Sequence, residues 1–206
     1  MRKTPRQTLT ALVLAGSAAL GLTSPHAGAQ PAGDNASDDE VLIIDGCPIW
    51  PYTRCPGADL RHANLVGRNL VGADFSGADL SRADLRGANL AVSNLQGANF
   101  TGARLNKATI SNANLQGARF IGTDLEAARL FRSDFSGAEF NGASLEIARL
   151  DKSWFVGTRF IATNMQEAKG NAINLKDAYF ESTITRYAIF PGTNMEGCTG
   201  CPKGWE

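Results

Sequence analysis

The chain has 206 residues, of which 20 are basic and 20 are acidic, so its formal net charge at pH 7 is zero. This balance argues against a strongly basic nucleic-acid-binding protein and against a strongly acidic mimic of DNA. Two histidines and four cysteines leave few side chains for a catalytic triad or a metal site.

Residues 1–29 are predicted to be a secretory signal peptide. A positive start with Arg2, Lys3 and Arg6 precedes the apolar run LTALVLAGSAALGL, which is too short to cross a bilayer. The small residues Ala27-Gly28-Ala29 form a cleavage site, so the mature chain is expected to begin at Gln30. No cysteine follows the apolar run closely, and we expect no membrane insertion after signal removal. The predicted location is therefore periplasmic or secreted.

Two short segments are expected between the signal peptide and the main body of the protein. Residues 30–40 are polar and contain Asp34, Asp38, Asp39 and Glu40, which is typical of a disordered acidic leader. Residues 41–56 contain several apolar side chains and are predicted to be an N-terminal cap.

Residues 57–190 repeat every five positions. The stretch GADLSRADLRGANL, from Gly77 to Leu90, shows Ala, then Asp or Asn, then Leu, then two variable residues. Large apolar residues continue at successive multiples of five from Leu60 to Met165, nearly always with a small residue two positions earlier. Five positions advance a helix by about 500°, and an odd step changes the face of a strand. The chain must therefore change direction between repeats.

This pattern resembles the pentapeptide repeat family, whose motif is Ala, Asp or Asn, Leu and two variable residues. Runs such as Ala73-Asp74-Phe75 and Ala88-Asn89-Leu90 carry the resemblance, which extends from Ala58 to Phe190. It implies an all-β fold, a right-handed quadrilateral (four-sided) β-helix solenoid with four pentapeptides per coil and about seven coils.

Features that recur every 20 residues support four pentapeptides per coil. Glycines recur at this spacing, and we expect them at corners that need a positive φ. They are Gly77, Gly97, Gly117, Gly137 and Gly157, with a second set at Gly102, Gly122 and Gly142. Charges of alternating sign recur in the same way, in the columns Asp84, Arg104, Asp124 and Arg119, Glu139, Arg159.

The cysteines of an exported chain are expected to be oxidised. Cys47 and Cys55 precede the repeats, whereas Cys198 and Cys201 lie in the predicted C-terminal cap, residues 191–206. About seven coils would separate the two pairs by roughly 30 Å, which is too far for a shared disulfide or zinc site. Two local disulfides are therefore predicted, and they would close solenoid ends that otherwise expose unpaired backbone.

No catalytic residue, cofactor site or metal site is predicted. His62 is the only histidine of the mature chain and occupies a variable outward position, and the many carboxylates follow from the repeat motif. The enzymatic alternative is thiol-disulfide chemistry at Cys198-Thr199-Gly200-Cys201. Such chemistry usually draws on a helix N-terminus, and nothing after Cys201 resembles a helix.

Mimicry of DNA, the activity that the family resemblance brings with it, is a less favoured alternative. Removing Arg2, Lys3 and Arg6 from the 20 basic residues leaves 17 against 20 acidic residues, which is not a strongly negative surface. The column Arg129, Arg149 and Lys169 even has the opposite sign. It is interpreted as a solvated charged face and not as a nucleic-acid site, because no aromatic column interleaves with it.

The remaining function is that of a rigid scaffold or protein-interaction module with an unknown protein partner. Phe131, Trp154 and Val156 form the predicted interaction patch, as the only outward cluster of large apolar residues expected in the coils. Gly170 and Thr185 interrupt the column of large residues. A bulge, a bend and a homodimer surface are all open explanations of this interruption.

Overall fold

The structure is a computed structural model that describes residues 41–205. The predicted signal peptide (1–29), the acidic leader (30–40) and the expected mature start at Gln30 lie outside the described residues. Every regular element in the described part of the chain is a short strand. Between residues 41 and 205 there is no helix with the length and hydropathy needed to cross a membrane.

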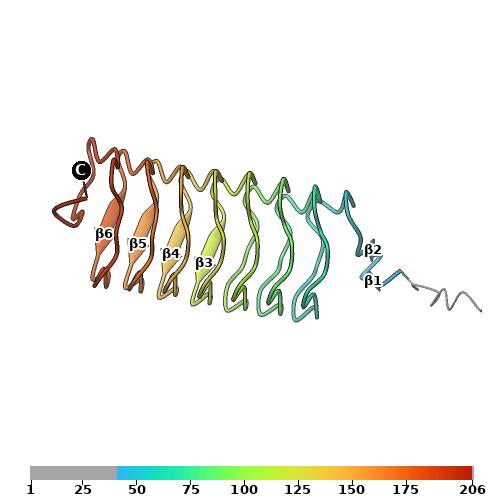
Figure 1. The fold of residues 1–206 in the computed structure, drawn as a ribbon. Coiled ribbons are helices and arrows are strands. Elements are labelled where there is room, and N and C mark those ends of the chain that lie inside the picture. Colours follow the sequence, from blue (N-terminus) through green and yellow to red (C-terminus); the bar gives the residue numbers. More distant parts are fainter. Residues whose placement is uncertain (1–40, 206) are drawn as a thin grey trace, which may run out of the picture. The chain divides into compact units, whose positions relative to one another are not determined.

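Consecutive coils are joined by parallel pairing between residues 20 positions apart, from Arg54 with Asp74 to Tyr179 with Thr199. The pairing is a backbone ladder in which Leu65 N–H donates to Asp84 O at 2.8 Å. Because a large buried residue recurs every five positions, each coil of 20 residues holds four pentapeptides. Figure 1 shows the coils of residues 41–205 stacked one behind another.

Where the ladder widens beyond single residue pairs it forms two small sheets. A two-stranded antiparallel sheet precedes the coils and consists of β1 (Ile43–Ile44) and β2 (Cys47–Pro48). A four-stranded parallel sheet in the C-terminal half has the order β3-β4-β5-β6 (Figure 1). Its strands are β3 (Arg119–Ile121), β4 (Glu139–Asn141), β5 (Arg159–Ile161) and β6 (Tyr179–Glu181).

Equivalent pentapeptides of successive coils form four rows, which we name after one buried member of each. The Phe120, Leu125, Leu130 and Phe135 rows each contain the pentapeptides displaced from that residue by multiples of 20. The large residues of the predicted column and the small residues before them are nearly all buried, which confirms the inward assignment. In the Phe120 row the rings stack along the axis, with centroids 5.0 Å apart for Phe100 and Phe120 and 4.6 Å apart for Phe120 and Phe140.

The corners between pentapeptides require the left-handed region of φ. Gly77 and Gly97 have φ of 65° and 66°, as predicted for the glycine column. The same position also holds residues with a Cβ, including Val92 with φ of 60°. A left-handed conformation costs such a residue about 1–2 kcal/mol, and it is especially unfavourable for a β-branched side chain. The ladder imposes this conformation because the corner recurs in every coil.

Val92→Gly should therefore stabilise the protein by about 0.5–1 kcal/mol, since relief of the strained corner outweighs the extra chain entropy of glycine. Little packing is lost, because Val92 is 61% exposed. Val66 is a matched control, being 45% exposed and outside the left-handed region. Val66→Gly should destabilise by about 0.5–1 kcal/mol. Urea denaturation measures the free energy of unfolding of both variants. A loss of stability in Val92→Gly as well as in Val66→Gly would show that the backbone of Val92 is not strained.

The interruption at Gly170 is compensated locally and is not a bulge. The ladder continues in register through the neighbouring pairs Arg149 with Lys169 and Trp154 with Asn174. Gly170 is buried, and a Cβ added there would lie 3.1 Å from Cγ2 of Ile173. Ile173 occupies a slot that usually holds alanine. Its larger side chain fills the space that the missing large residue leaves.

This compensation predicts strong coupling between the two positions. Ile173→Ala should destabilise by about 2–4 kcal/mol through a cavity, and Gly170→Leu by about 1–3 kcal/mol through overpacking. The double variant restores the regular motif, so its loss should be at least about 1 kcal/mol smaller than the sum of the single losses. Denaturation of all variants measures the coupling. Ile173→Ala combined with the distant Leu85→Ala is the additive control, and additivity in the Gly170–Ile173 pair would refute the compensation.

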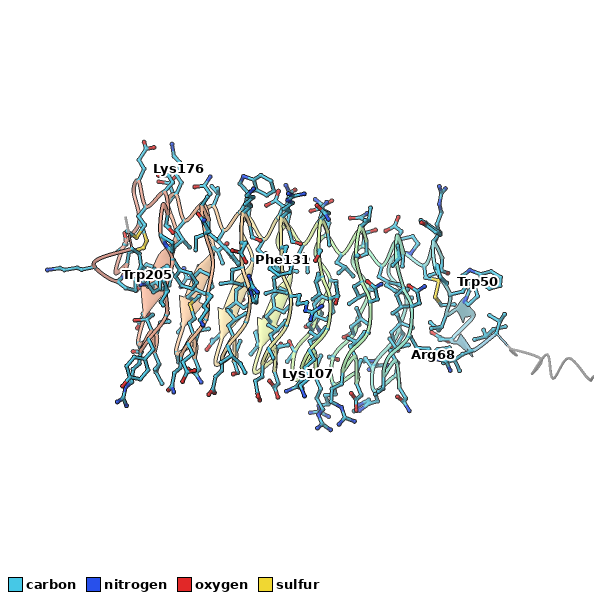
Figure 2. The ribbon with its side chains drawn as sticks, viewed as in Figure 1. Trp50, Arg68, Lys107, Phe131, Lys176 and Trp205 are labelled. Atoms are coloured by element: carbon cyan, nitrogen blue, oxygen red, sulfur yellow. A yellow bond between two sulfur atoms is a disulfide. The ribbon has the colours of Figure 1, made fainter. Side chains whose placement is uncertain are left out.

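Trp205 covers part of the last coil. Its ring packs edge-on against Phe190, with centroids 4.3 Å apart, and against Phe180 at 6.3 Å. The backbone of Thr193 also donates to Trp205 O at 3.4 Å. Figure 2 shows Trp205 at the C-terminal end of the coils. The C-terminal segment therefore adds a buried side chain, that of Trp205, to the hydrophobic core.

The rest of the last coil keeps an open edge. Within residues 41–205 the backbone N–H groups of Thr185, Tyr187 and Phe190 have no carbonyl partner, whereas Met165 N–H, one coil earlier than Thr185, donates to Ile184 O at 2.7 Å. Thr185 occupies a slot for a large residue and is only half-buried. The short residue at Thr185 thus coincides with the uncovered part of the stack.

Candidate functional site

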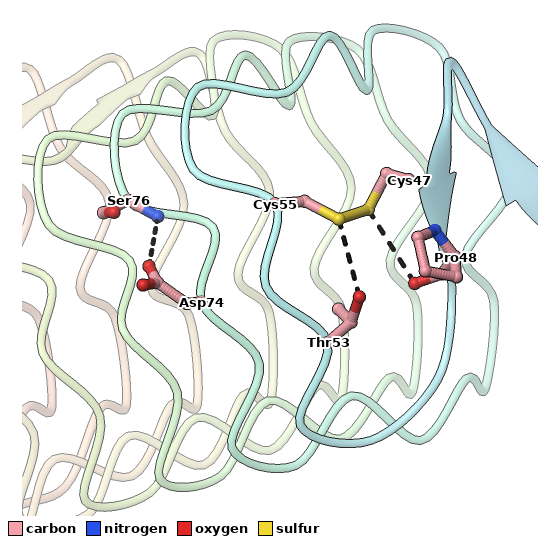
Figure 3. The surroundings of a disulfide bond; sticks show 6 residues. All are labelled: Cys47, Pro48, Thr53, Cys55, Asp74 and Ser76. Atoms are coloured by element: carbon pink, nitrogen blue, oxygen red, sulfur yellow. Dashed lines mark hydrogen bonds between the residues drawn. A yellow bond between two sulfur atoms is a disulfide. The ribbon is translucent and has the colours of Figure 1, made fainter.

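The aspartates of the motif are parts of turns. Asp74 Oδ1 accepts hydrogen bonds from Ser76 N–H and from the side-chain amide of Asn94, both at 3.0 Å. Figure 3 shows the bond from Ser76. The Ser76 backbone bond, followed by the bonds from the Ser76 and Asn94 side chains, holds the pKa of the Asp74 carboxyl below its usual value. These bonds favour the ionised form, so the carboxylate acts as a turn cap and not as a proton donor.

The predicted stacking of opposite charges is present in two rows. Arg104 lies 3.8 Å from Asp84, and Arg119 lies 3.7 Å from Glu139. Asp84 makes its closer ion pair with Arg86, two residues away in the same coil, at 2.7 Å. All these side chains remain in contact with solvent, so each pair contributes little to stability. Their importance is that they avoid repulsion between stacked coils.

His62 is exposed at a corner near the start of the coils, with φ of 59°. It lines a shallow hollow together with Asp45, Asp59, Arg61 and Ile44. Among residues 41–205 no three His, Cys, Asp or Glu side chains gather closely enough to bind a metal ion. The arrangement around His62 contains acids and a guanidinium, but no hydroxyl or thiol that the imidazole could activate.

The four cysteines form two local pairs in the structure. Cys47 is bonded to Cys55 and Cys198 to Cys201, with Cα atoms 5.8 Å and 5.9 Å apart. The first pair is buried beside Thr53, whose hydroxyl lies 3.5 Å from Cys55 Sγ (Figure 3). These Cα separations fall in the usual range for protein disulfides. The pairs lie at the two ends of the ladder, because Cys55 follows Arg54 of the first ladder pair and Cys198 precedes Thr199 of the last.

The second pair lies in a tight turn beside the last coil. Cys198 and Cys201 are half-buried in a turn that includes Gly200, with φ of 71°. A Cβ at Gly200 would collide with the carbonyl oxygen of Phe180, so the turn packs tightly on the last coil. No helix occurs in the described part of the chain, and a helix N-terminus is the usual means of lowering a thiol pKa at such a motif. The disulfide thus holds a tight turn against the backbone of Phe180.

Trp154 and Val156 lie together on the outside of the Phe135 row. Trp154 pairs in the ladder with Asp134 and Asn174 and is 46% exposed. Val156 follows two residues later and is half-buried, while Phe155 between them is fully buried. Side chains alternate between opposite sides of extended backbone, so Trp154 and Val156, on either side of the inward Phe155, are expected on one surface. The backbone of Trp154 is bonded, but its side chain fills no core slot.

Phe131 lies in a different environment, in the Leu130 row. Its half-buried ring is covered by the Arg149 guanidinium, whose carbon lies 5.3 Å from the ring centroid. The ring lines a hollow of about 430 Å³. The other lining residues are Ser111, Asn112, Arg132, Arg149, Asp151 and Lys152. Figure 2 shows Phe131 midway between Trp50 and Trp205 along the stack. Neither Trp154 nor Val156 lines this hollow, so Phe131 belongs to a separate surface.

Comparison with protein families matches the chain to the family described as pentapeptide repeats, in eight copies over residues 53–91, 86–120 and 110–146. The solved structure of a pentapeptide repeat protein from Nostoc PCC 7120 is 34% identical to the chain. The matched region covers 46% of this chain and 69% of that protein, with a TM-score of 0.31. The chain belongs to the pentapeptide repeat family.

Two further pentapeptide repeat structures match this chain at lower identity. HetL, a protein of the cyanobacterium Nostoc sp. strain PCC 7120 involved in regulation of heterocyst differentiation, is 23% identical, with 71% of this chain and 82% of HetL covered and a TM-score of 0.51. This likeness shows a common fold. QnrB1, a plasmid-mediated fluoroquinolone resistance protein, is 20% identical, with 70% of this chain and 71% of QnrB1 covered and a TM-score of 0.45. No curated protein matches the chain in sequence.

The patch around Trp154 is not the only outward apolar cluster of this pentapeptide repeat protein, and that prediction was wrong. In the last coil Ile184, Tyr187 and Ile189 are 53%, 62% and 57% exposed. They occupy outward slots next to the open edge, where earlier coils carry mostly polar residues. The signal was available in the sequence as three apolar residues at outward positions of one coil.

Proposed function

We propose that this pentapeptide repeat protein is an exported, non-catalytic scaffold or protein-interaction module of the periplasm or the extracellular space. The proposal rests on one observation, which is that inward side chains form the core and motif carboxylates cap turns, so that only the other outward side chains are free to bind a partner. The large residues of the repeats fill the core, and the motif carboxylates cap turns. A function therefore has to come from outward side chains, and Trp154 with Val156 provides a large exposed apolar contact.

We further propose a rigid rod that carries one disulfide at each end, with part of the last coil left open. It would comprise the signal peptide (1–29), the leader (30–40), an N-terminal cap (41–56), a right-handed four-sided β-helix of about seven coils (57–190) and a C-terminal cap (191–206). The continuous ladder from Arg54 to Thr199 supports the rod, because each coil is fixed to its neighbours by backbone bonds. The two cysteine pairs support a disulfide-fastened turn at each end, beside the backbone groups that the last coil leaves unpaired.

Export predicts a processed and oxidised protein. Mass spectrometry of protein isolated from the envelope fraction should find Gln30 as the first residue and a peptide linking Cys47 to Cys55. Cys47→Ser should lower the free energy of unfolding by about 2–3 kcal/mol, since a short loop is no longer closed in the unfolded chain. Val13→Arg is the matched control, because a charge in the apolar run should block export and leave Met1 and free thiols. Free thiols and an intact Met1 in the unaltered chain would disprove export.

An interaction role predicts a partner at the Trp154 surface. A photo-crosslinking amino acid at position 156 should capture a defined protein in the envelope, and Trp154→Ser should reduce the yield at least fivefold without changing the melting temperature. The fold should persist because the Trp154 side chain fills no core slot.

The control places the same crosslinker at Gln96, which occupies the equivalent outward slot three coils earlier and is exposed. Crosslinks of equal yield at positions 96 and 156, or a yield at position 156 that does not respond to Trp154→Ser, would show that Trp154 is ordinary exposed surface.

A further inference from the structure

The Leu130 row stacks like charges directly on one another. Arg129 pairs in the ladder with Arg149, and Arg149 pairs with Lys169. All three side chains are exposed. Like charges at paired positions destabilise a sheet. The neighbouring Leu125 row avoids this, because Asp84 there stacks on Arg104.

The same three residues also give up a turn cap. Earlier in the Leu130 row, Asn69 and Asn89 accept the backbone N–H two residues later, at 3.4 Å and 3.1 Å. Arginine and lysine have no acceptor and cannot make this bond. Three consecutive coils thus depart from the motif in two ways at the same position: they stack like charges, and they lack the side-chain cap of the turn. Such conflicts between local preference and fold occur mainly at functional positions.

Two more cations lie beside this column. Arg132 and Lys152 are exposed at successive corners of the same row and line the hollow that contains Phe131. We call the five cations that these three coils place in the row the basic stripe. They are Arg129, Arg132, Arg149, Lys152 and Lys169. The hollow contains one carboxylate, that of Asp151, which lies 3.4 Å from Arg149. The stripe therefore keeps a clear excess of positive charge.

Phe131 adds an apolar surface to the stripe, and its ring helps to order the guanidinium of Arg149. The ring lies under Arg149, and Asp151 holds the same guanidinium from the side. Contact with a ring face and a carboxylate restricts the rotamers of a long side chain, so less entropy is lost when it binds a ligand. Arg149 is still 58% exposed and can form further hydrogen bonds.

We propose that the basic stripe binds an acidic segment of a partner protein in an extended conformation. Carboxylates of the segment pair with the Arg and Lys side chains, and an apolar side chain contacts Phe131. This inference rests on the proposed role as an interaction module, and it adds a second surface and the chemistry of its partner.

The spacing of the stripe suits an extended peptide. Coils are about 4.8 Å apart, so the column from Arg129 to Lys169 spans about 10 Å. Side chains on one side of an extended peptide recur every ~6.6 Å, and two or three acidic residues can reach the whole column. Arginine binds a carboxylate with two parallel hydrogen bonds. A single small anion could contact only part of the stripe.

Nucleic acid fits the stripe less well. Binding of a single strand uses exposed aromatic faces on which bases stack, and Phe131 is the only aromatic residue lining the hollow among the described residues. Arg149 already covers one face of this single ring.

Fluorescence anisotropy tests the proposal with the full exported chain and a fluorescein-labelled decapeptide of alternating Glu and Ala. The unaltered protein should bind it in a salt-dependent manner. The double variant Arg132→Ala/Lys152→Ala should bind at least tenfold more weakly. The matched control Arg119→Ala/Arg159→Ala removes two exposed cations from the Phe120 row and should change the affinity less than twofold. Phe131→Ser should weaken binding about threefold at unchanged melting temperature, because the Arg149 guanidinium loses the ring that orders it.

Three results would overturn the proposal. Equal weakening by the two double variants would mean that only net charge matters. Tighter binding of a single-stranded DNA of equal charge, or of vesicles with anionic phospholipid, would assign the stripe to another class of ligand. Absence of peptide binding, together with a persistent crosslink at position 156, would show that the stripe is not a binding site and would leave the proposed interaction role intact. Peptide binding without that crosslink would instead count against the Trp154 surface alone.

Discussion

Backbone hydrogen bonds between neighbouring coils determine where every other side chain lies. The bonds join residues about 20 positions apart, such as Leu65 N–H with Asp84 O, and the register holds from Arg54 to Thr199. Each residue therefore lies beside its equivalent in the next coil. The Phe120 row shows the result inside, as a continuous stack of rings. Outside, the same register places outward residues that are 20 positions apart next to one another, so that they form columns of charged or apolar side chains.

The sequence predicted those parts of the fold that depend only on spacing along the chain. The five-residue period identified the buried column, and the glycines at intervals of 20 identified corners with positive φ. It could not predict that Ile173 fills the space left by Gly170. That compensation depends on the distance between two neighbouring inward slots, which no periodicity reveals. Nor did it show that Val92 is forced into a left-handed corner, because the residue type gives no sign of it.

The candidate site was predicted less completely, for a related reason. Alternation along a strand suffices to bring Trp154 and Val156 to one surface. The place of Phe131 depends on how side chains turn at a corner, and there the contact with Arg149 draws the ring into a separate hollow. The exposure of Ile184 and Tyr187 depends on the path of the C-terminal segment. This segment covers Phe190 but leaves these residues open, and sequence spacing carries no information on such coverage.

The equivalence of the four pentapeptides in a coil limits how such a chain can change length. A duplication of 20 residues preserves every row and moves the downstream surface one step along the axis. An insertion of five residues also keeps large residues inward, because the buried slot recurs at that interval. It nevertheless transfers each downstream residue to the next row, so that Trp154 would leave the Phe135 row for the Phe120 row. Length changes in evolution can thus turn a binding surface around the axis without repacking the interior.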